Sequence, residues 1–412
     1  HYYNRSINGT HYSQHAVDSV VNHGKLMVDQ IDSKPHLRGG PNRNAFSPWE
    51  SLQLLKRDVS YALTKNLYNY WLEGGPGNMF PIVRHHPEVY GPMWFDSPEI
   101  IGLIAELKKL MDVNQEAKTQ SVTEVAFFTS NLGSYYRKME TMFGNLYVEA
   151  IRQWILPEVS APFDDDFPNI DKSYKVYLFT DVHYMSDELR KSIVRKLEKD
   201  QATAIWMYAP AYLNEQGCSL SNIEALTGIK INYREQKDFI QVEIAQSGHP
   251  LGRGLTQSTY GSDIDPAYFT QDIRWMPFNT NKDDYQFSPI FFAEDPQAQT
   301  IGKLQKSGLP GLVYKDLGKR KSVYSSAPLL HAGLIRNILT EAGVHLYSSD
   351  HNLVYANDTF VAMTAYQKGA QTIVLPRQAT VHDALSGDKI GDKIREIRYD
   401  AQQYETRIFR LS

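Results

Sequence analysis

Residues 25–32 read Lys-Leu-Met-Val-Asp-Gln-Ile-Asp, a short apolar run that closes on polar side chains. The run predicts a β-strand over 25–31, and a loop rich in Gly, Pro and Asn follows at 39–48. Pro48-Trp49-Glu50 then opens a predicted helix. Its apolar face consists of Leu52, Leu55, Val59 and Leu63.

The same order of elements repeats immediately downstream. A second predicted strand, 67–72, ends on Glu73 and a Gly-Gly-Pro-Gly turn. A long aromatic loop runs to Trp94, and Ser97-Pro98-Glu99 starts another helix. Strand, loop and helix in succession are typical of an α/β barrel or a doubly wound sheet, so residues 1–115 are expected to form α/β structure.

A second α/β region is predicted over 120–348, after a polar boundary at 112–121. Short links between strands and helices favour a flavodoxin-like parallel sheet, interrupted by a β-rich insertion at 230–300. Residues 349–412 alternate short strands with turns and predict a small antiparallel β domain. The elements predicted in the second region include strands at 125–128, 176–179, 204–208 and 344–347, a helix at 134–156, and a helix with Ser186 as its N-cap.

Composition excludes several classes of protein. The chain has 412 residues, of which 42% are hydrophobic and 22% charged, so a sizeable core can form. The formal charge of −4 gives no basic surface for nucleic acid, and no apolar run is long enough to span a membrane. The single Cys218 excludes an internal disulfide. The chain starts without an initiator Met, so localisation stays open between the cytoplasm and a periplasmic or secreted destination.

The first candidate site is Asp29-Gln30-Ile31-Asp32, at the end of the first predicted strand. Barrel enzymes carry their chemistry at the carboxyl ends of strands. Side chains alternate along a strand, so Gln30 and Asp32 are predicted to share one face while Asp29 points the other way. The alternative is that Asp29 and Asp32 merely cap the following loop.

The second candidate site is Tyr70-Trp71-Leu72-Glu73, with Trp94-Phe95-Asp96 repeating its pattern. An aromatic ring can stack on the C–H face of a sugar while a neighbouring carboxylate accepts hydroxyl hydrogen bonds. Trp71, Glu73 and Trp94 are therefore predicted to bind a carbohydrate. The alternatives are a core Trp71 beside a solvated Glu73, and a hydrophobic staple at Trp94 ahead of the next helix.

Other polar clusters give no metal or cofactor prediction. His85 and His86 are adjacent and lack a third ligand at helical spacing. Asp164-Asp165-Asp166 lacks the spacing of a calcium loop. Ser130-Asn131-Leu132-Gly133-Ser134 is only a weak imitation of a phosphate-binding loop. No metal, nucleotide or flavin is therefore expected.

A collinear series of short motifs extends over most of the chain. They include Tyr3 with Arg5 and Gly9, His23-Gly24-Lys25-Leu26 with Asp29-Gln30-Ile31-Asp32, Tyr70-Trp71-Leu72-Glu73, Trp94-Phe95-Asp96-Ser97-Pro98-Glu99, Trp206-Met207-Tyr208-Ala209-Pro210, and Ile373-Val374-Leu375-Pro376. In these motifs the chain resembles glycoside hydrolase family 42, the β-galactosidases. The resemblance implies the last strands of a (β/α)8 barrel, a flavodoxin-like domain that mediates trimerisation, and a small C-terminal β domain.

The resemblance also implies a retaining mechanism with two carboxylates. Gln30 matches the nucleophile, Glu73 matches a residue that binds sugar hydroxyls, and Tyr3, Asp29, Asp32, Trp71 and Trp94 are expected around the sugar. The family's acid/base glutamate belongs to an earlier barrel strand, upstream of His1. Carbohydrate is the expected partner, in a homotrimer without a cofactor.

The amide at position 30 leaves two hypotheses open. The first is a β-galactosidase-like glycoside hydrolase whose first barrel strands are missing from this chain, which alone is expected to be inactive. The second is a non-catalytic sugar-binding or assembly module, because a carboxamide cannot form the glycosyl ester.

Overall fold

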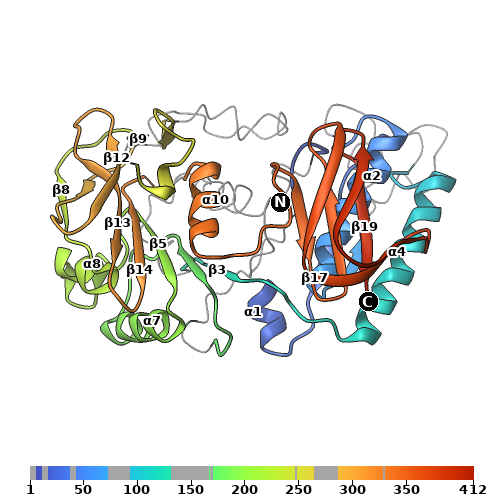
Figure 1. Cartoon of the computed structure of the whole chain (residues 1–412), viewed down its shortest axis with the longest axis horizontal. Helices are drawn as coiled ribbons and strands as arrows, with labels where there is room; N and C mark the ends of the chain where they lie inside the picture. The colour runs from blue at the N-terminus through green and yellow to red at the C-terminus, as the bar shows by residue number, and fades with distance from the viewer. Residues whose placement is uncertain are drawn as a thin grey trace.

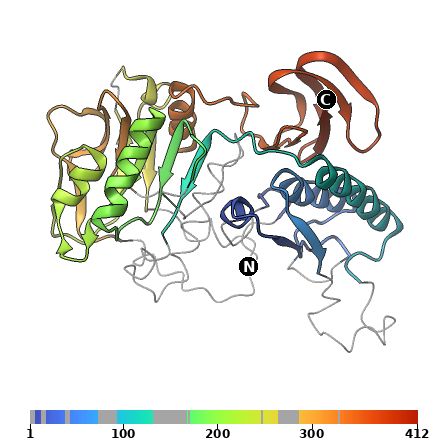
Figure 2. The same ribbon diagram turned by 90° about the horizontal axis from the view of Figure 1, so that it is seen from below.

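The computed structural model describes residues 6–11, 17–37, 43–72, 93–130, 167, 170–245, 248–263, 286–327 and 330–412. It is a mixed α/β molecule with one large sheet and several small ones. The large sheet lies at one end of the molecule, and helices α2 (Pro48–Thr64) and α4 (Pro98–Ala117) lie beside the C-terminal sheet at the other (Figures 1 and 2).

The N-terminal part is a β–α–β–α unit, as the sequence predicts. A short helix, α1 (Val17–Asn22), precedes the unit, whose elements are β1 (Val28–Ile31), α2 (Pro48–Thr64), β2 (Tyr68–Trp71) and α4 (Pro98–Ala117). β1 and β2 pair in parallel, with Gln30 opposite Tyr70 and Ile31 opposite Trp71. The predicted start of α2 is confirmed, since Pro48 follows an N-cap, Ser47, whose hydroxyl accepts from the Glu50 amide at 3.1 Å. The unit is consistent with part of a barrel.

One face of α2 joins the N-terminal unit to the C-terminal sheet. Leu55, Val59 and Leu63 share a buried cluster with Ile31 of β1 and with Phe360 of the C-terminal sheet. Helix α2 also contacts β1, β2 and α4. Since apolar burial is the main stabilising term in folding, these two parts of the chain stabilise each other.

The middle part is built on an eight-stranded sheet. The strand order is β10-β9-β12-β13-β14-β5-β4-β3. The strands are β3 (Val125–Phe128), β4 (Val176–Phe179), β5 (Thr203–Met207), β9 (Gln241–Ile244), β10 (Thr259–Gly261), β12 (Gln299–Leu304), β13 (Pro310–Asp316) and β14 (Lys321–Ser325). Helices α7 (Asp187–Asp200) and α8 (Leu220–Thr227) cover one face, and α10 (Ala332–Glu341) covers the other. The predicted N-cap of α7, Ser186, is confirmed.

Smaller elements complete the middle part. β8 (Ile231–Arg234) pairs with β11 (Ile290–Ala293), and β6 (Leu213–Asn214) pairs with β7 (Gly217–Cys218). A 3-10 turn, η3 (Pro250–Gly252), contacts α10.

The sheet differs from the parallel, flavodoxin-like sheet that the sequence predicts. Only β3, β4, β5 and β14 run parallel, while the other four strands are antiparallel to their neighbours. Two strands from the predicted insertion, β9 and β10, extend this same sheet next to β12, because their backbone groups find partners at its edge. In the described strands β3, β4 and β5 lie in chain order, whereas a flavodoxin-like sheet places its first strand between the second and third.

The C-terminal part is an antiparallel sheet, as the sequence predicts for residues 349–412. Its order is β15-β16-β19-β17-β18. The strands are β15 (Leu353–Ala356), β16 (Phe360–Thr364), β17 (Gly369–Asp383), β18 (Lys389–Ala401) and β19 (Thr406–Leu411). A further strand predicted from the sequence over 344–347 is instead irregular, and the predicted helix over 134–156 lies outside the described residues. Within the described ranges, no helix has the length and apolar character needed to cross a membrane.

Candidate functional site

The open face of β1 and β2 carries Gln30. Side chains alternate along both strands, so Val28 and Gln30 of β1 share this face with Tyr68 and Tyr70 of β2. Val28 is 40% exposed, and Tyr68 and Tyr70 are each 45% exposed. The Tyr70 hydroxyl donates a hydrogen bond to Oε1 of Gln30. An amide and an aromatic ring therefore stand together on an accessible surface.

Asp29 lies on the opposite face and is buried. Its Oδ2 lies 2.6 Å from Nε2 of His11, whose ring is fully buried. The other ring nitrogen of His11 lies 3.4 Å from Oδ1 of Asp58 on α2. The predicted alternation of Asp29 and Gln30 is thus observed, and Asp29 takes part in a buried network rather than facing solvent.

The network extends through α2 to the loop at 6–11. Arg57 is fully buried and its Nη2 lies 2.8 Å from Oδ1 of Asp58. Nη1 of the same guanidinium donates to the carbonyls of Ser6 at 2.6 Å and Gly9 at 2.9 Å. The Ser33 hydroxyl donates to Asp58. Each buried charged group of the network is therefore either paired with a group of opposite charge or hydrogen-bonded to a polar group.

The electrostatics of this network favour an ionised Asp58. Burial by itself raises the pKa of the carboxyl group, but the Arg57 guanidinium, His11 and the Ser33 hydroxyl together hold that pKa well below its usual range. The C-terminal sheet closes the network from the other side. Tyr355 donates to the carbonyl of His11 at 2.7 Å, and Tyr366 donates to the carbonyl of Gly9 at 3.0 Å.

The remaining predicted site residues fall into distinct environments. Trp71 faces α4 and meets Phe95 edge-on, with ring centroids 5.6 Å apart, so it does not share the face of Gln30. Trp94 is 3% exposed within the cluster around α2, which matches the hydrophobic-staple alternative better than an exposed platform. Asp32 is buried at the end of β1. Tyr3 and Glu73 lie outside the described residues.

Two kinds of site residue do not follow from the sequence. Tyr70 belongs to the second candidate motif, but its place beside Gln30 depends on the register between the two strands. His11 and Asp58 have no local signal, because each meets Asp29 or its neighbours only through the fold. Within the ranges that the structure describes, no group of three or more His, Cys, Asp or Glu side chains could hold a metal ion. His85, His86 and Asp164–Asp166 lie outside those ranges.

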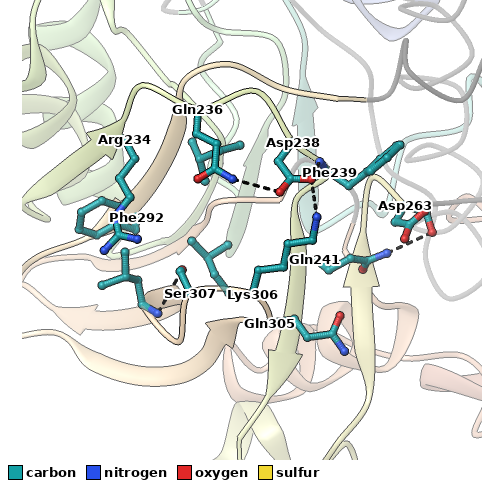
Figure 3. Close-up of a pocket in the computed structure, with 13 residues that line it drawn as sticks. Arg234, Gln236, Asp238, Phe239, Gln241, Asp263, Phe292, Gln305, Lys306 and Ser307 are labelled. Carbon is teal, nitrogen blue, oxygen red and sulfur yellow. Dashed lines mark hydrogen bonds and ion pairs between the residues drawn. The ribbon is translucent and has the colours of Figure 1, made fainter.

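A separate hollow lies in the middle part, beneath the turn between β12 and β13 (Figure 3). It encloses about 80 Å³, with Phe292 and Leu304 among its apolar residues. Nζ of Lys306 lies 2.6 Å from Asp238, and the Arg234 guanidinium lies 6.0 Å from the centre of the Phe292 ring. Since its ionic groups are paired or stacked and its volume is small, this hollow is a weaker candidate than the face around Gln30.

No protein-family model matches the chain, and no curated protein matches it. Solved structures do match. The β-galactosidase from Rahnella sp. R3 superposes with a TM-score of 0.65 at 13% identity, covering 97% of this chain and 57% of that one. A catalytic mutant of a GH42 β-galactosidase from G. stearothermophilus gives 0.58 at 12%, covering 89% and 51%. An α-L-fucosidase from Paenibacillus thiaminolyticus gives 0.53 at 10%, covering 98% and 67%.

These similarities confirm the resemblance to GH42 β-galactosidases at the level of the fold. The chain spans about half the length of the β-galactosidases that it matches, with shares of 57% and 51% of those chains. The chain therefore shares its fold with part of these β-galactosidases.

Proposed function

We propose that this chain is the C-terminal portion of a β-galactosidase-like retaining glycoside hydrolase, and that its β1 and β2 are the last strands of a (β/α)8 barrel. The observation that carries the proposal is the position of Gln30. It lies at the end of a parallel strand, on the accessible face, in a fold shared with β-galactosidases. Barrel enzymes carry their reacting groups at this end of their strands.

The chemistry of a retaining glycosidase limits what Gln30 can do. One carboxyl group protonates the leaving oxygen and a second attacks the anomeric carbon, with the two about 5–5.5 Å apart. A carboxamide is uncharged at neutral pH and is not such a nucleophile. Gln30 can still donate to and accept from sugar hydroxyls. We infer that the chain with Gln30 binds carbohydrate without turning it over, and the acid/base group is expected from an earlier strand.

The sugar contacts that we propose centre on Gln30 and Tyr70, with Tyr3 and Glu73 around them. Asp29, Asp32 and Trp94 are each 3% exposed, and Trp71 meets Phe95 edge-on on the opposite face of β2. We therefore assign these four residues to supporting the strand ends rather than to touching a sugar. A free guanidinium or ammonium group is not needed, because a neutral sugar is bound through hydroxyl hydrogen bonds and ring stacking.

The amide specifically favours a second candidate function, a non-catalytic sugar-binding or assembly module. Residues 1–115, 120–348 and 349–412 are proposed as its three parts, with the middle part mediating a homotrimer. Light scattering tests the assembly, since a monomer over the whole concentration range contradicts the trimer.

The decisive experiment replaces the amide by a carboxylate in a protein that carries the complete barrel. Gln30→Glu is expected to hydrolyse nitrophenyl β-galactoside, while the protein with Gln30 binds galactose by calorimetry and releases no nitrophenol. Gln216→Glu, at an exposed loop position, controls for the added charge. If the Gln30→Glu protein hydrolyses neither galactosides nor fucosides, the glycosidase assignment is wrong. If galactose binding is also absent, the sugar-binding alternative fails with it.

A further inference from the structure

Both ring nitrogens of His11 face a carboxylate. Nε2 lies 2.6 Å from Oδ2 of Asp29, and Nδ1 lies 3.4 Å from Oδ1 of Asp58. Carboxylate oxygens accept hydrogen bonds, whereas a neutral imidazole has only one N–H group to donate. Both contacts are therefore favourable only when each nitrogen carries a proton, which makes the ring an imidazolium.

Two other histidines of the chain show the opposite arrangement. Nδ1 of His249 accepts from the Leu251 amide at 3.2 Å, and Nδ1 of His331 accepts from the Gly333 amide at 3.1 Å. A nitrogen that accepts carries no proton, so these two rings are neutral. Burial also lowers the pKa of both rings. They are internal references for a neutral imidazole.

The surroundings of His11 have room for one more positive charge. The charged and titratable groups around the ring are Asp29 of β1, Arg57, Asp58 and Tyr61 of α2, and Tyr355 of β15. Two carboxylates and one guanidinium sum to one negative charge, which an imidazolium cancels. Burial raises the pKa of Tyr355 well above its ordinary value, so that hydroxyl stays neutral.

The competing arrangement moves the proton from Nε2 of His11 to Asp29. It leaves the ring neutral and also balances the charges. A histidine, with an ordinary pKa of about 6.5, is more basic than an aspartate, with an ordinary pKa of about 3.9. The second carboxylate, Asp58, adds to this preference because a nearby negative charge stabilises the protonated ring. The proton therefore belongs on His11.

We propose that His11 is a positively charged positioning residue, an imidazolium held between Asp29 and Asp58 that fixes the end of β1 so that residue 30 faces the sugar. Asp29 and Gln30 are adjacent and point to opposite faces of β1, so a fixed Asp29 sets the direction of Gln30. The positioning role rests on the proposed function, whereas the charge of His11 does not.

The loop that carries His11 is itself fastened. Nη1 of Arg57 donates to the carbonyls of Ser6 and Gly9, and Tyr355 donates to the carbonyl of His11 at 2.7 Å. The ring is fully buried, so water cannot replace its two carboxylate partners. A displacement of the end of β1 would therefore break a buried ion pair, which is how a residue behind the strand can control the face in front of it.

Nitrogen NMR of the full chain labelled with 15N-histidine tests the charge. Both ring nitrogens of His11 are expected to give imidazolium signals at pH 7 and at pH 8, whereas His249 and His331 each show one nitrogen without a proton. The His11 signals are assigned by their proximity to the Tyr61 ring, whose centroid lies 5.2 Å away, and by their loss in His11→Gln. A ring nitrogen of His11 without a proton at pH 7 overturns the proposal.

The Gln30→Glu protein with the complete barrel tests the positioning role. Adding Asp29→Asn is expected to lower kcat for nitrophenyl β-galactoside by about tenfold or more and to change KM by about threefold or less, because residue 29 does not touch the sugar. The same substitution should remove the proton from one ring nitrogen of His11 at pH 8, since an amide can donate to it. Asp112→Asn, on the exposed side of α4, is the control and should change neither readout. An unchanged kcat in Asp29→Asn contradicts the positioning role.

The two proposals can fail separately. A Gln30→Glu protein that neither binds nor hydrolyses galactosides removes the glycosidase and the positioning role, while imidazolium signals from His11 would still establish its charge. Hydrolysis by a protein whose His11 is neutral leaves the glycosidase standing and removes this inference.

Discussion

At the scale of single residues, the most consequential group is the buried set around Asp58. His11, Asp29, Arg57 and Asp58 are all at most 3% exposed, and they join the loop at 6–11 to β1 and α2. Burial removes the screening that makes surface ion pairs weak, so each member depends strongly on its partners. This network holds the strand end next to Gln30 from behind.

Asp58→Asn is expected to destabilise the chain by about 3–5 kcal/mol, because it removes the buried negative charge that pairs with the Arg57 guanidinium. Urea unfolding followed by circular dichroism measures the change. Asp112→Asn is the matched control, since Asp112 pairs with Lys108 on the exposed side of α4 and surface pairs contribute little. Equal effects of the two substitutions would show that the buried pair is not a stabilising feature.

The same carboxylate predicts how stability depends on pH. The pKa of Asp58 is lower in the folded chain than in the unfolded chain, so the unfolded state binds its proton first as the pH falls. Its contribution is complete above the ordinary aspartate pKa of about 4 and is lost as the pH falls below it toward the folded value. Stability measured from pH 7 to pH 3 should therefore fall less steeply in Asp58→Asn. Parallel profiles for the two proteins would contradict this assignment.

At the scale of elements, a local sequence pattern predicts a helix or strand well where residues of the same pattern also satisfy the backbone hydrogen bonds of that element. The N-caps Ser47, Ser97 and Ser186 are all followed by the predicted helices, since a cap satisfies orphan amides within one turn. Strand β18 (Lys389–Ala401) was not predicted, because its many charged side chains hide the two-residue period. Its place is set by pairing with β17, which is a non-local property.

The antiparallel half of the large sheet likewise depends on strand pairing that the local sequence does not predict. The short apolar runs of β3, β4 and β5 indicate buried strands, but nothing near β9 or β12 in the sequence indicates which neighbour each will pair with. The candidate site also contains some residues that local sequence predicts and others that only the fold brings together. Gln30 and the alternation around it follow from the period of a strand, whereas the pairing of Asp29 with His11 needs the folded chain.

Gly261, at the end of β10, is expected to be essential for that edge of the sheet. Its φ is +147°, and a Cβ there would lie 1.9 Å from the carbonyl oxygen of Ile240. Gly261→Ala should therefore displace β10 and lower the thermal midpoint by several degrees, since about 1 kcal/mol corresponds to 2–4 °C for larger domains. Gly387→Ala is the control, because Gly387 also has a positive φ, +79°, but nothing lies within 4 Å. A smaller effect at Gly261 than at Gly387 would contradict the close approach.

At the scale of the whole molecule, the N-terminal unit, the large sheet and the C-terminal sheet share hydrophobic clusters, so they are not independently packed domains. The cluster around α2 joins β1 and α4 to β16 and β19. Another cluster joins Tyr61 of α2 to the large sheet and to Tyr355 of β15. Helix α2 is therefore the element that connects the candidate site with the rest of the fold (Figure 1).

This connection predicts that the N-terminal unit and the C-terminal sheet unfold together. Phe360 of β16 is fully buried against Leu55 and Val59 of α2, so Phe360→Ala should cost about 3–5 kcal/mol. Because the cavity lies between the two parts, hydrogen exchange should speed up in α2 as well as in β16 and β19. Phe409→Ala serves as the control, since Phe409 is equally buried but lies in the separate cluster on the other face of the same sheet. Loss of protection confined to the C-terminal sheet in Phe360→Ala, with α2 unchanged, would mean that the shared cluster does not couple the two parts.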